Sequence, residues 1–184
     1  DGGVDPVRDK EIIDMELVLK DIETCEKRVD KLKKGAKGGE KELVKKAEIG
    51  IKILAHLSEG KPARNLDLSE EGEELIAEMM LLTSKPVLYV CNVDEGSAVN
   101  GNSFTEAFID SLGNEDSEVI LISAAIEEDI AQLEEYEEKL EFVQEMGLKE
   151  PGVNRVIRSC YNLLKLNTFF TAGEKEVRAW TVKR

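Results

Sequence analysis

The stretch Pro86-Val-Leu-Tyr-Val-Cys-Asn-Val-Asp-Glu95 decides the fold. Its first part, Val87 to Cys91, is a short apolar run of β-forming residues directly after Pro86, which is typical of a strand buried on both faces of a parallel sheet. The run ends at Asn92, and polar, turn-forming residues follow it. Ligands of open α/β sheets bind at the carboxyl ends of the strands. We therefore expect residues 92–95 to lie at a binding edge.

A second apolar run of the same kind, Val119-Ile-Leu-Ile122, ends in Ser123-Ala-Ala125. If the two runs are neighbouring parallel strands, their following loops meet at one edge of the sheet. Helical patterns separate the apolar runs, and this alternation favours an α/β fold. The alternative for residues 92–95 is a turn that merely ends a strand.

Taken together, Asn92-x-x-Glu95 and Ser123-Ala-Ala125 resemble the base-recognition loops of P-loop GTPases, in the variant carried by the Obg-like ATPases of the YchF type. The usual guanine-binding sequence is Asn-Lys-x-Asp; here Val93 replaces the Lys and Glu95 replaces the Asp. Six other segments resemble the family in the same order along the chain: Asp5-Pro-Val-Arg-Asp9, Gly60-Lys-Pro-Ala-Arg64, Lys85-Pro-Val-Leu-Tyr-Val90, Gly152-Val-Asn-Arg155, Phe169-Phe-Thr-Ala-Gly173 and Glu176-Val-Arg-Ala-Trp180.

The resemblance implies an α/β fold: the rear half of a Rossmann-like P-loop G domain, an inserted antiparallel α-helical coiled coil, and the first hairpin of a β-grasp (TGS) domain. The expected boundaries are 1–14 with 62–166 for the partial G domain, 15–61 for the coiled coil and 167–184 for the start of the TGS domain. It also implies ATP as the ligand, preferred over GTP, and a ribosomal or other translation partner. The residues expected to bind the base are Asn92, Val93, Glu95, Ser123, Ala124 and Ala125.

The phosphate half of such a site is not encoded here. P-loop enzymes need Gly-x-x-x-x-Gly-Lys-[Ser/Thr] to hold the phosphates and Mg²⁺, and this sequence has no such motif. We therefore expect a central fragment of an ATPase, with no catalytic residue and no Mg²⁺ ligand of its own, that is inactive alone. Two alternatives are an interaction module, whose coiled-coil arm docks a protein or ribosomal partner under nucleotide control, and an unrelated α/β protein.

Heptad spacing predicts the helical arm. Apolar residues at 3,4 spacing run through residues 15–32 and again through 43–57, on either side of the Gly-rich loop 35–39. The first seam is Met15, Val18, Ile22, Cys25, Val29 and Leu32, and the second is Leu43, Ala47, Gly50, Leu54 and Leu57. Folded back at the loop, these seams pair Cys25 with Gly50. Ile12, Ile13 and Leu17 lie partly off the seam, and we expect them to face a globular core.

Beyond residue 100, further helices are predicted. A short one runs through Phe104 and Leu112, and an acidic one spans residues 127–146 with a solvated charged face. A third starts at Pro151 with a buried stripe: Val153, Val156, Ile157, Cys160, Tyr161 and Leu164. Residues 168–172 and 177–182 predict two strands around a turn.

Charge limits the partners. The net charge is −14, from 25 basic and 39 acidic residues, so general phosphate neutralisation and sequence-specific DNA binding are not expected, and contact with RNA requires a local basic patch. No apolar run reaches membrane-spanning length and the start lacks signal-peptide character, so we expect a cytoplasmic protein that binds no membrane. Three scattered cysteines predict free, buried thiols.

Overall fold

The computed structural model describes residues 3–113, 115 and 117–184, and its chain divides into two compact units, Asp1–Pro86 and Val87–Arg184. The domain boundaries predicted from the sequence differ from this division, because the structure groups residues 61–86 with the two long helices. As an assignment to family domains, those boundaries stay a prediction.

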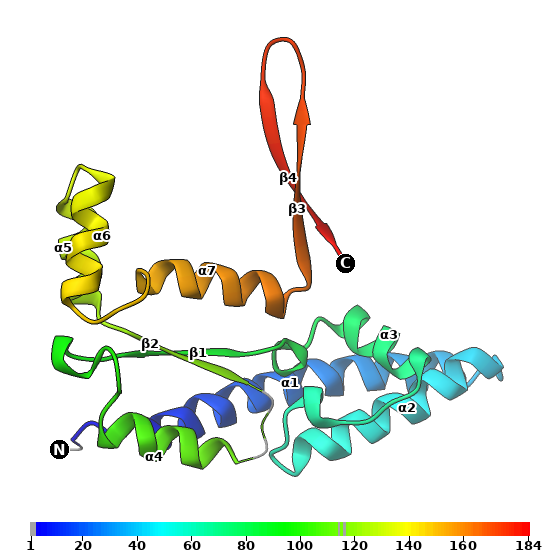
Figure 1. The fold of residues 1–184 in the computed structure, drawn as a ribbon. Helices are drawn as coiled ribbons and strands as arrows, with labels where there is room; N and C mark the ends of the chain where they lie inside the picture. Colours follow the sequence, from blue (N-terminus) through cyan, green and yellow to red (C-terminus); the bar gives the residue numbers. More distant parts are fainter. Residues whose placement is uncertain (1–2, 114, 116) are drawn as a thin grey trace. The chain divides into compact units, whose positions relative to one another are not determined.

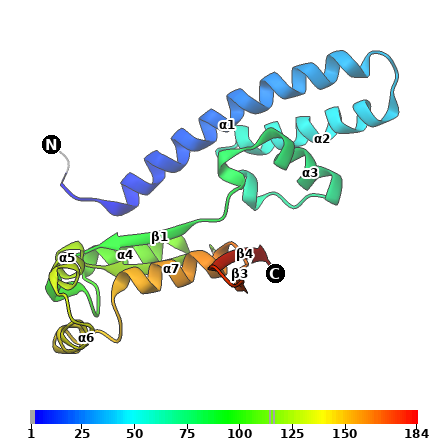
Figure 2. The ribbon, with the colours of Figure 1, turned by 90° about the horizontal axis from the view of Figure 1, so that it is seen from above.

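The first unit is built on a pair of antiparallel helices. Helix α1 (Pro6–Ala36) and helix α2 (Lys41–Ser58) lie side by side and are joined by the short Gly-rich turn (Figures 1 and 2). Asp5 caps α1 by accepting a hydrogen bond from the Arg8 amide at 3.1 Å, with Pro6 at the first helical position. In the described part of the chain, no helix combines the length and apolarity needed to cross a membrane.

The contact between α1 and α2 follows the predicted seam in the half of the pair that is nearer the connecting turn. The Cys25 thiol lies 3.7 Å from the Gly50 carbonyl oxygen, as the predicted register requires. Val29 and Ala47 are both buried in the same apolar cluster. The absence of a side chain at Gly50 allows this close approach, because a Cβ there would lie 3.0 Å from Val29 Cγ2.

In the half of the pair that is farther from the connecting turn, the seam prediction is wrong in part. Met15, which belongs to the predicted seam, is 49% exposed. Ile12 and Ile13, predicted to face a globular core, are 50% and 57% exposed. On α2, Ile53 is fully buried, whereas the predicted Leu54 is only half-buried. The physical reason is that α2 packs on a third layer as well as on α1, so its buried face is wider than a two-helix seam.

That third layer is residues 61–86. It contains the 3₁₀ turn η1 (Ala63–Asn65), helix α3 (Glu70–Met79) and the 3₁₀ turn η2 (Leu82–Ser84), which pack on the two long helices. Leu75 and Leu81 are fully buried in the same cluster as the seam residues. The first unit is therefore a three-layer helical body.

A buried carboxylate joins the layers. Asp21, on α1, is 1% exposed and accepts three hydrogen bonds: from the Leu82 amide at 2.7 Å, the Thr83 amide at 2.7 Å and the Thr83 hydroxyl at 2.6 Å. The same hydroxyl oxygen accepts from the Ala63 amide at 2.9 Å. A buried charge is stable only when its oxygens are hydrogen-bonded in this way. Asp21 thus fixes η1 and η2 against α1.

The second unit carries the predicted parallel strands. Strand β1 (Leu88–Asn92) pairs in parallel with strand β2 (Glu118–Ile122), with Leu88 opposite Glu118 and Asn92 opposite Ile122. Helix α4 (Ser103–Leu112) lies in the connection between them. The expectation that β1 is buried on both faces is wrong here, because Val90 is 46% exposed. Within the described residues, β1 has one neighbouring strand and a partly covered face.

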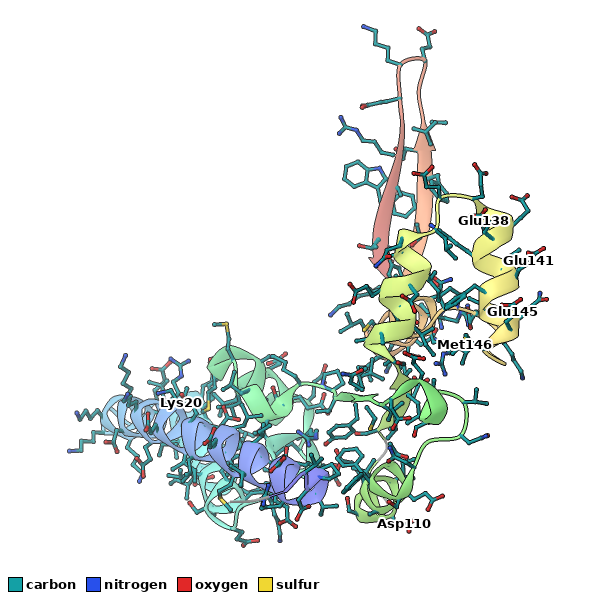
Figure 3. All side chains as sticks on the ribbon, turned by 90° about the vertical axis from the view of Figure 1, so that its left-hand side faces the viewer. Lys20, Asp110, Glu138, Glu141, Glu145 and Met146 are labelled. Atoms are coloured by element: carbon teal, nitrogen blue, oxygen red, sulfur yellow. The ribbon has the colours of Figure 1, made fainter. Side chains whose placement is uncertain are left out.

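The predicted acidic helix over 127–146 is two helices. Helix α5 (Ala124–Gln132) and helix α6 (Tyr136–Glu145) are separated by extended backbone at Leu133 and Glu135. A continuous helix would hold Ile130 and Val143 about 20 Å apart, but both are buried in one cluster with Ala98. The break allows this burial. Figure 3 shows Glu138, Glu141 and Glu145 on the side of α6 that points away from α5, as the predicted solvated face requires.

The buried stripe predicted for helix α7 (Gly152–Leu163) is wrong in part. Val153, Ile157 and Leu164, which belong to the predicted buried stripe, are each about half exposed (48%, 52% and 51%). Two polar residues of α7 bond to β2: the Arg155 guanidinium donates to the Leu121 carbonyl oxygen at 2.6 Å, and the Ser159 hydroxyl donates to the Glu118 carboxylate at 2.8 Å. The other stripe residues, Val156, Cys160 and Tyr161, are half-buried. Hydrogen bonds therefore help to attach the helix to the sheet.

The last element is the predicted hairpin. Strand β3 (Leu166–Ala172) pairs antiparallel with strand β4 (Val177–Lys183), with Phe169 opposite Trp180. The Gly173 amide closes the turn on the Glu176 carbonyl oxygen at 2.9 Å. Its aromatic side chains are exposed, and Trp180 is 47% exposed. The hairpin extends away from α7 (Figure 1).

The cysteines are free thiols, as predicted. Cys25 is fully buried, and burial raises the pKa of its thiol to about 11. Cys91 and Cys160 are each half-buried. Burial also raises the pKa of the Cys91 thiol. Raised pKa values keep the thiols of Cys25 and Cys91 protonated and unreactive near neutral pH.

Replacing Asp21 with Ala tests the layer contact. The substitution leaves the buried Thr83 amide and hydroxyl and the part-buried Leu82 amide without their acceptor, so we expect the free energy of unfolding to fall by about 3 kcal/mol. Urea denaturation measures this change, and amide hydrogen exchange at Leu82 and Thr83 should accelerate. Asp30→Ala, at an exposed position of the same helix, is the control. Equal stability of the two variants would contradict the role of Asp21.

Replacing Gly50 with Leu tests the helix–helix approach. A side chain there meets Val29 Cγ2 at 3.0 Å, Leu32 Cδ1 at 3.7 Å and Met79 Cε at 3.8 Å. We expect overpacking to destabilise the first unit by about 1–3 kcal/mol, measured by thermal or urea unfolding. Ala55→Leu, at an exposed position on α2, adds a similar bulk without the contact and should be nearly neutral.

Candidate nucleotide-base site

The carboxyl ends of β1 and β2 bring the two predicted loops together. Asn92 and Ile122 are the last paired residues of the sheet, and the Val93 amide continues the pairing by donating to the Ile122 carbonyl oxygen at 2.8 Å. Because parallel strands end at the same edge, residues 92–95 and 123–125 start from adjacent positions. The expectation that both loops share one edge is confirmed.

The Asn92 side chain joins the loops directly. Its Oδ1 accepts a hydrogen bond from the Ala124 amide at 3.0 Å. Ala124 is the first residue of α5, so this bond satisfies one of the amides that a helix start leaves without an internal partner. The remaining carboxamide nitrogen, Nδ2, has no hydrogen-bond partner among the described residues, and Asn92 is exposed.

The rest of the first loop is shaped by Asp94. Its carboxylate accepts from the Ser97 amide at 2.9 Å and caps the 3₁₀ turn η3 (Glu95–Ser97). Glu95 is exposed and Val93 is half-buried. Sequence reasoning assigned no role to Asp94, although an Asp three residues before Ser97 at the start of a helical turn is an ordinary capping signal.

In the second loop, the three predicted residues differ in exposure. Ser123 is 3% exposed, and its carbonyl oxygen accepts from the Glu127 amide at 3.0 Å, in the first turn of α5. Ala124 and Ala125 are exposed. The start of a helix favours electron-rich groups, and at α5 one such group is the Asn92 side-chain oxygen.

A second set of contacts, not predicted from the sequence, holds α5 in place. The Glu127 carboxylate accepts from the amides of Gly152 at 2.6 Å and Val153 at 3.2 Å, so α5 caps α7. A Cβ at Gly152 would lie 2.8 Å from Glu127 Oε1. Gly152 and Val153 belong to the segment Gly152-Val-Asn-Arg155, which carries part of the family resemblance. Their bonds to Glu127 position α5 against the start of α7.

A hollow of ≈ 290 Å³ in the same unit lies apart from the predicted residues. Its lining is Ala98, Val99, Gly147, Leu148, Lys149, Glu150 and Arg155, which includes none of the six residues expected to bind the base. In the part of the chain that the structure describes, no three His, Cys, Asp or Glu side chains group as a metal site would require.

Comparison with known proteins shows which family the chain belongs to. Among curated relatives, the ribosome-binding ATPase YchF of Bacillus subtilis is 45% identical over 185 residues, and that of Escherichia coli O157:H7 is 46% identical over 183. These matches cover 100% and 98% of this chain. The chain belongs to the YchF family. It spans about half the length of these relatives, 50% and 49%, and no family model matches it.

The fold supports the same assignment. The solved structure of the Schizosaccharomyces pombe YchF GTPase superposes with a TM-score of 0.88 at 31% identity, covering 100% of this chain and 50% of that one. The family resemblance inferred from the sequence is therefore confirmed, as is the α/β class.

Replacing Asn92 with Leu tests the junction of the loops. Without Oδ1 the Ala124 amide loses its partner, and we expect its hydrogen exchange to accelerate severalfold, with a stability loss of about 1 kcal/mol because the site is exposed. Hydrogen exchange read at single residues measures this. Asn154→Leu, at an exposed position on α7, serves as the control. Unchanged exchange at Ala124 would contradict the contact.

Proposed function

We propose that this chain carries the purine-binding part of a nucleotide site in a translation-associated P-loop protein that binds and hydrolyses ATP. The relatives are named ribosome-binding ATPases and the solved neighbour a GTPase. The observation that supports the proposal best is the Asn92–Ala124 hydrogen bond, which ties two loops at the end of a parallel sheet into one rim.

The rim offers groups that match a purine. With Oδ1 held by Ala124, Asn92 presents Nδ2 as a donor, and a ring nitrogen of a purine is a suitable acceptor. The exposed start of α5 adds the Ala125 amide, and the half-buried Val93 adds an apolar contact for the ring. Ser123 acts through its backbone, since its side chain is buried.

Base preference follows from what replaces the guanine-binding carboxylate. Adenine presents a donor at N6 beside an acceptor at N1, the reverse of the guanine edge. Glu95 stands where that recognition sequence has a shorter Asp, so guanine loses a well-placed acceptor for its two donors. An unpaired polar group costs about 1–3 kcal/mol, roughly a ten- to hundredfold change in affinity. We therefore propose ATP over GTP.

We propose that phosphate and Mg²⁺ are bound by residues outside this chain. When bound, Mg²⁺ would neutralise charge on the phosphates during hydrolysis. The sequence here has no P-loop motif, so we assign this chemistry to the half of the relatives' length that the chain does not match. We propose that the chain alone is inactive and binds ATP weakly or not at all.

A second candidate function uses the helical pair. The antiparallel helices α1 and α2 would act as a coiled-coil arm that docks a protein or ribosomal partner, with nucleotide as the regulator. The exposed β3–β4 hairpin would be the start of a TGS domain. The two candidates are separable in a full-length protein that carries this chain, because deletion of residues 33–42 there should abolish partner binding and spare hydrolysis.

The test of the base proposal exchanges the loop chemistry. In a chimera of full-length Bacillus subtilis YchF carrying this chain as its matching half, Val93→Lys with Glu95→Asp should move the ratio of the ATP and GTP dissociation constants toward GTP by roughly ten- to a hundredfold. Isothermal titration measures both constants.

The control places the same changes away from the rim, as Val177→Lys with Glu174→Asp on the exposed hairpin, and should leave the ratio unchanged. If the unaltered chimera already prefers GTP, or if the loop variant leaves the ratio unchanged, the proposal is wrong.

A further inference from the structure

The hollow of ≈ 290 Å³ in the second unit has both an apolar and a cationic lining, and the purine proposal uses neither. Ala98 and Val99 come from the segment that follows η3, and residues 147–150 come from the loop between α6 and α7. This loop begins just after Met146, which Figure 3 labels at the end of α6. Arg155, near the start of α7, completes the lining.

The apolar part of the lining is held by the core of the second unit. Ala98 is 3% exposed and belongs to a buried cluster against which Leu148 packs. The Leu148 amide donates to the Val143 carbonyl oxygen at 2.9 Å, which fixes the loop on α6. Gly147 has a φ of 71°, and a Cβ there would lie 3.6 Å from Val99 Cγ2. The two segments are therefore in contact, and the hollow has fixed walls.

The Arg155 guanidinium has donors that the described residues do not use. Its Nη2 donates to the Leu121 carbonyl oxygen at 2.6 Å, which ties the side chain to β2 near the end of the strand. Its Nε is buried without a hydrogen-bond partner among the described residues, and none of them accepts from Nη1. A buried donor without a partner is rare in native proteins. A guanidinium held in this way is pre-oriented for the two oxygens of a carboxylate or phosphate.

The charge around the hollow is positive, although the chain carries a net charge of −14. Residues 147–158 contain three basic residues, Lys149, Arg155 and Arg158, and one acidic residue, Glu150. Both Glu150 carboxylate oxygens accept from Arg158, each at 2.7 Å. These hydrogen bonds lower the pKa of the Glu150 carboxyl, and the nearby Arg155 charge lowers it further. Lys149 is exposed and has no ion-pair partner in the part of the chain that the structure describes. The hollow therefore attracts anions.

We propose that the hollow binds a small organic anion, with its carboxylate or phosphate between Lys149 and Arg155 and its apolar part against Val99 and Leu148. Both head groups present oxygens that accept from a guanidinium and an ammonium. Ligand pockets start at about 300 Å³, so a hollow of this volume fits a small ligand. None of the six residues expected to bind the base lines the hollow, so this site is additional to the proposed purine site.

The experiment titrates the full, isotopically labelled chain with benzoate and, separately, with phenyl phosphate, and follows the backbone amide NMR signals. We expect saturable shifts at Val99 and residues 147–150, with a dissociation constant of about 1 mM or tighter. The acid that binds more tightly identifies the head group. Benzyl alcohol has the ring without the charge, and inorganic phosphate has the charge without the ring, so both should bind about tenfold more weakly.

Two variants change the hollow itself. Lys149→Gln removes an exposed cation and should weaken binding of the acids about threefold, and Val99→Phe fills the apolar side and should weaken it about tenfold. Their matched controls carry the same changes on the exposed hairpin, as Lys175→Gln and Val177→Phe, and should keep the affinity of the parent chain. Val99 is 49% exposed, so the fold should tolerate the larger side chain, and the spectrum without ligand checks this.

The absence of saturable shifts with both acids would overturn the proposal, as would binding that either hollow variant leaves unchanged. Shifts centred on residues 92–95 and 123–125 would place the anion at the base rim and would also overturn it. Equal binding of benzyl alcohol or of inorganic phosphate would show that charge and apolar contact are not both needed, with the same consequence. Failure of the purine proposal would leave these titrations unchanged.

Discussion

The parallel pairing of β1 with β2 is the constraint on which the second unit depends. Two parallel strands cannot be joined by a tight turn, so the chain must travel back before it pairs again, and α4 lies in that return. Both strands then end at the same edge. Asn92 and Ala124, 32 positions apart in the chain, become hydrogen-bonding neighbours, and residues 92–95 come to lie beside residues 123–125 at one edge of the sheet.

The first unit depends on a different interaction. Its two long helices could pack through apolar residues alone, but the third layer is oriented by the buried Asp21 carboxylate and its three donors. Apolar contacts are non-directional, whereas a carboxylate with fixed donors accepts one arrangement. Ion pairs to Glu71 and Glu78 add to the same attachment from outside.

The predictions that were wrong share a physical cause. A pattern of apolar spacing shows which residues lie on one face of an element, not what that face contacts. Val90 on β1 and Ile157 on α7 lie on apolar faces as predicted, yet each is about half exposed because no described element covers it. The acidic stretch over 127–146 looked continuous because helix propensity is local, and the break that buries Ile130 and Val143 together is a tertiary requirement.

By itself, the sequence determined the family, through ordered motifs spread over the whole chain, and the positions of the main helices and strands, since these follow from periodicity and capping. It also determined that residues 92–95 and 123–125 end adjacent strands. Only the tertiary structure decided that Asn92 bonds to Ala124, that Glu127 caps α7, and that Asp21 lies buried in a helix whose pattern marks it as one more polar residue. Each of these contacts joins residues at least 25 positions apart, and the partner of a polar side chain at that separation is chosen by packing, which local pattern does not encode.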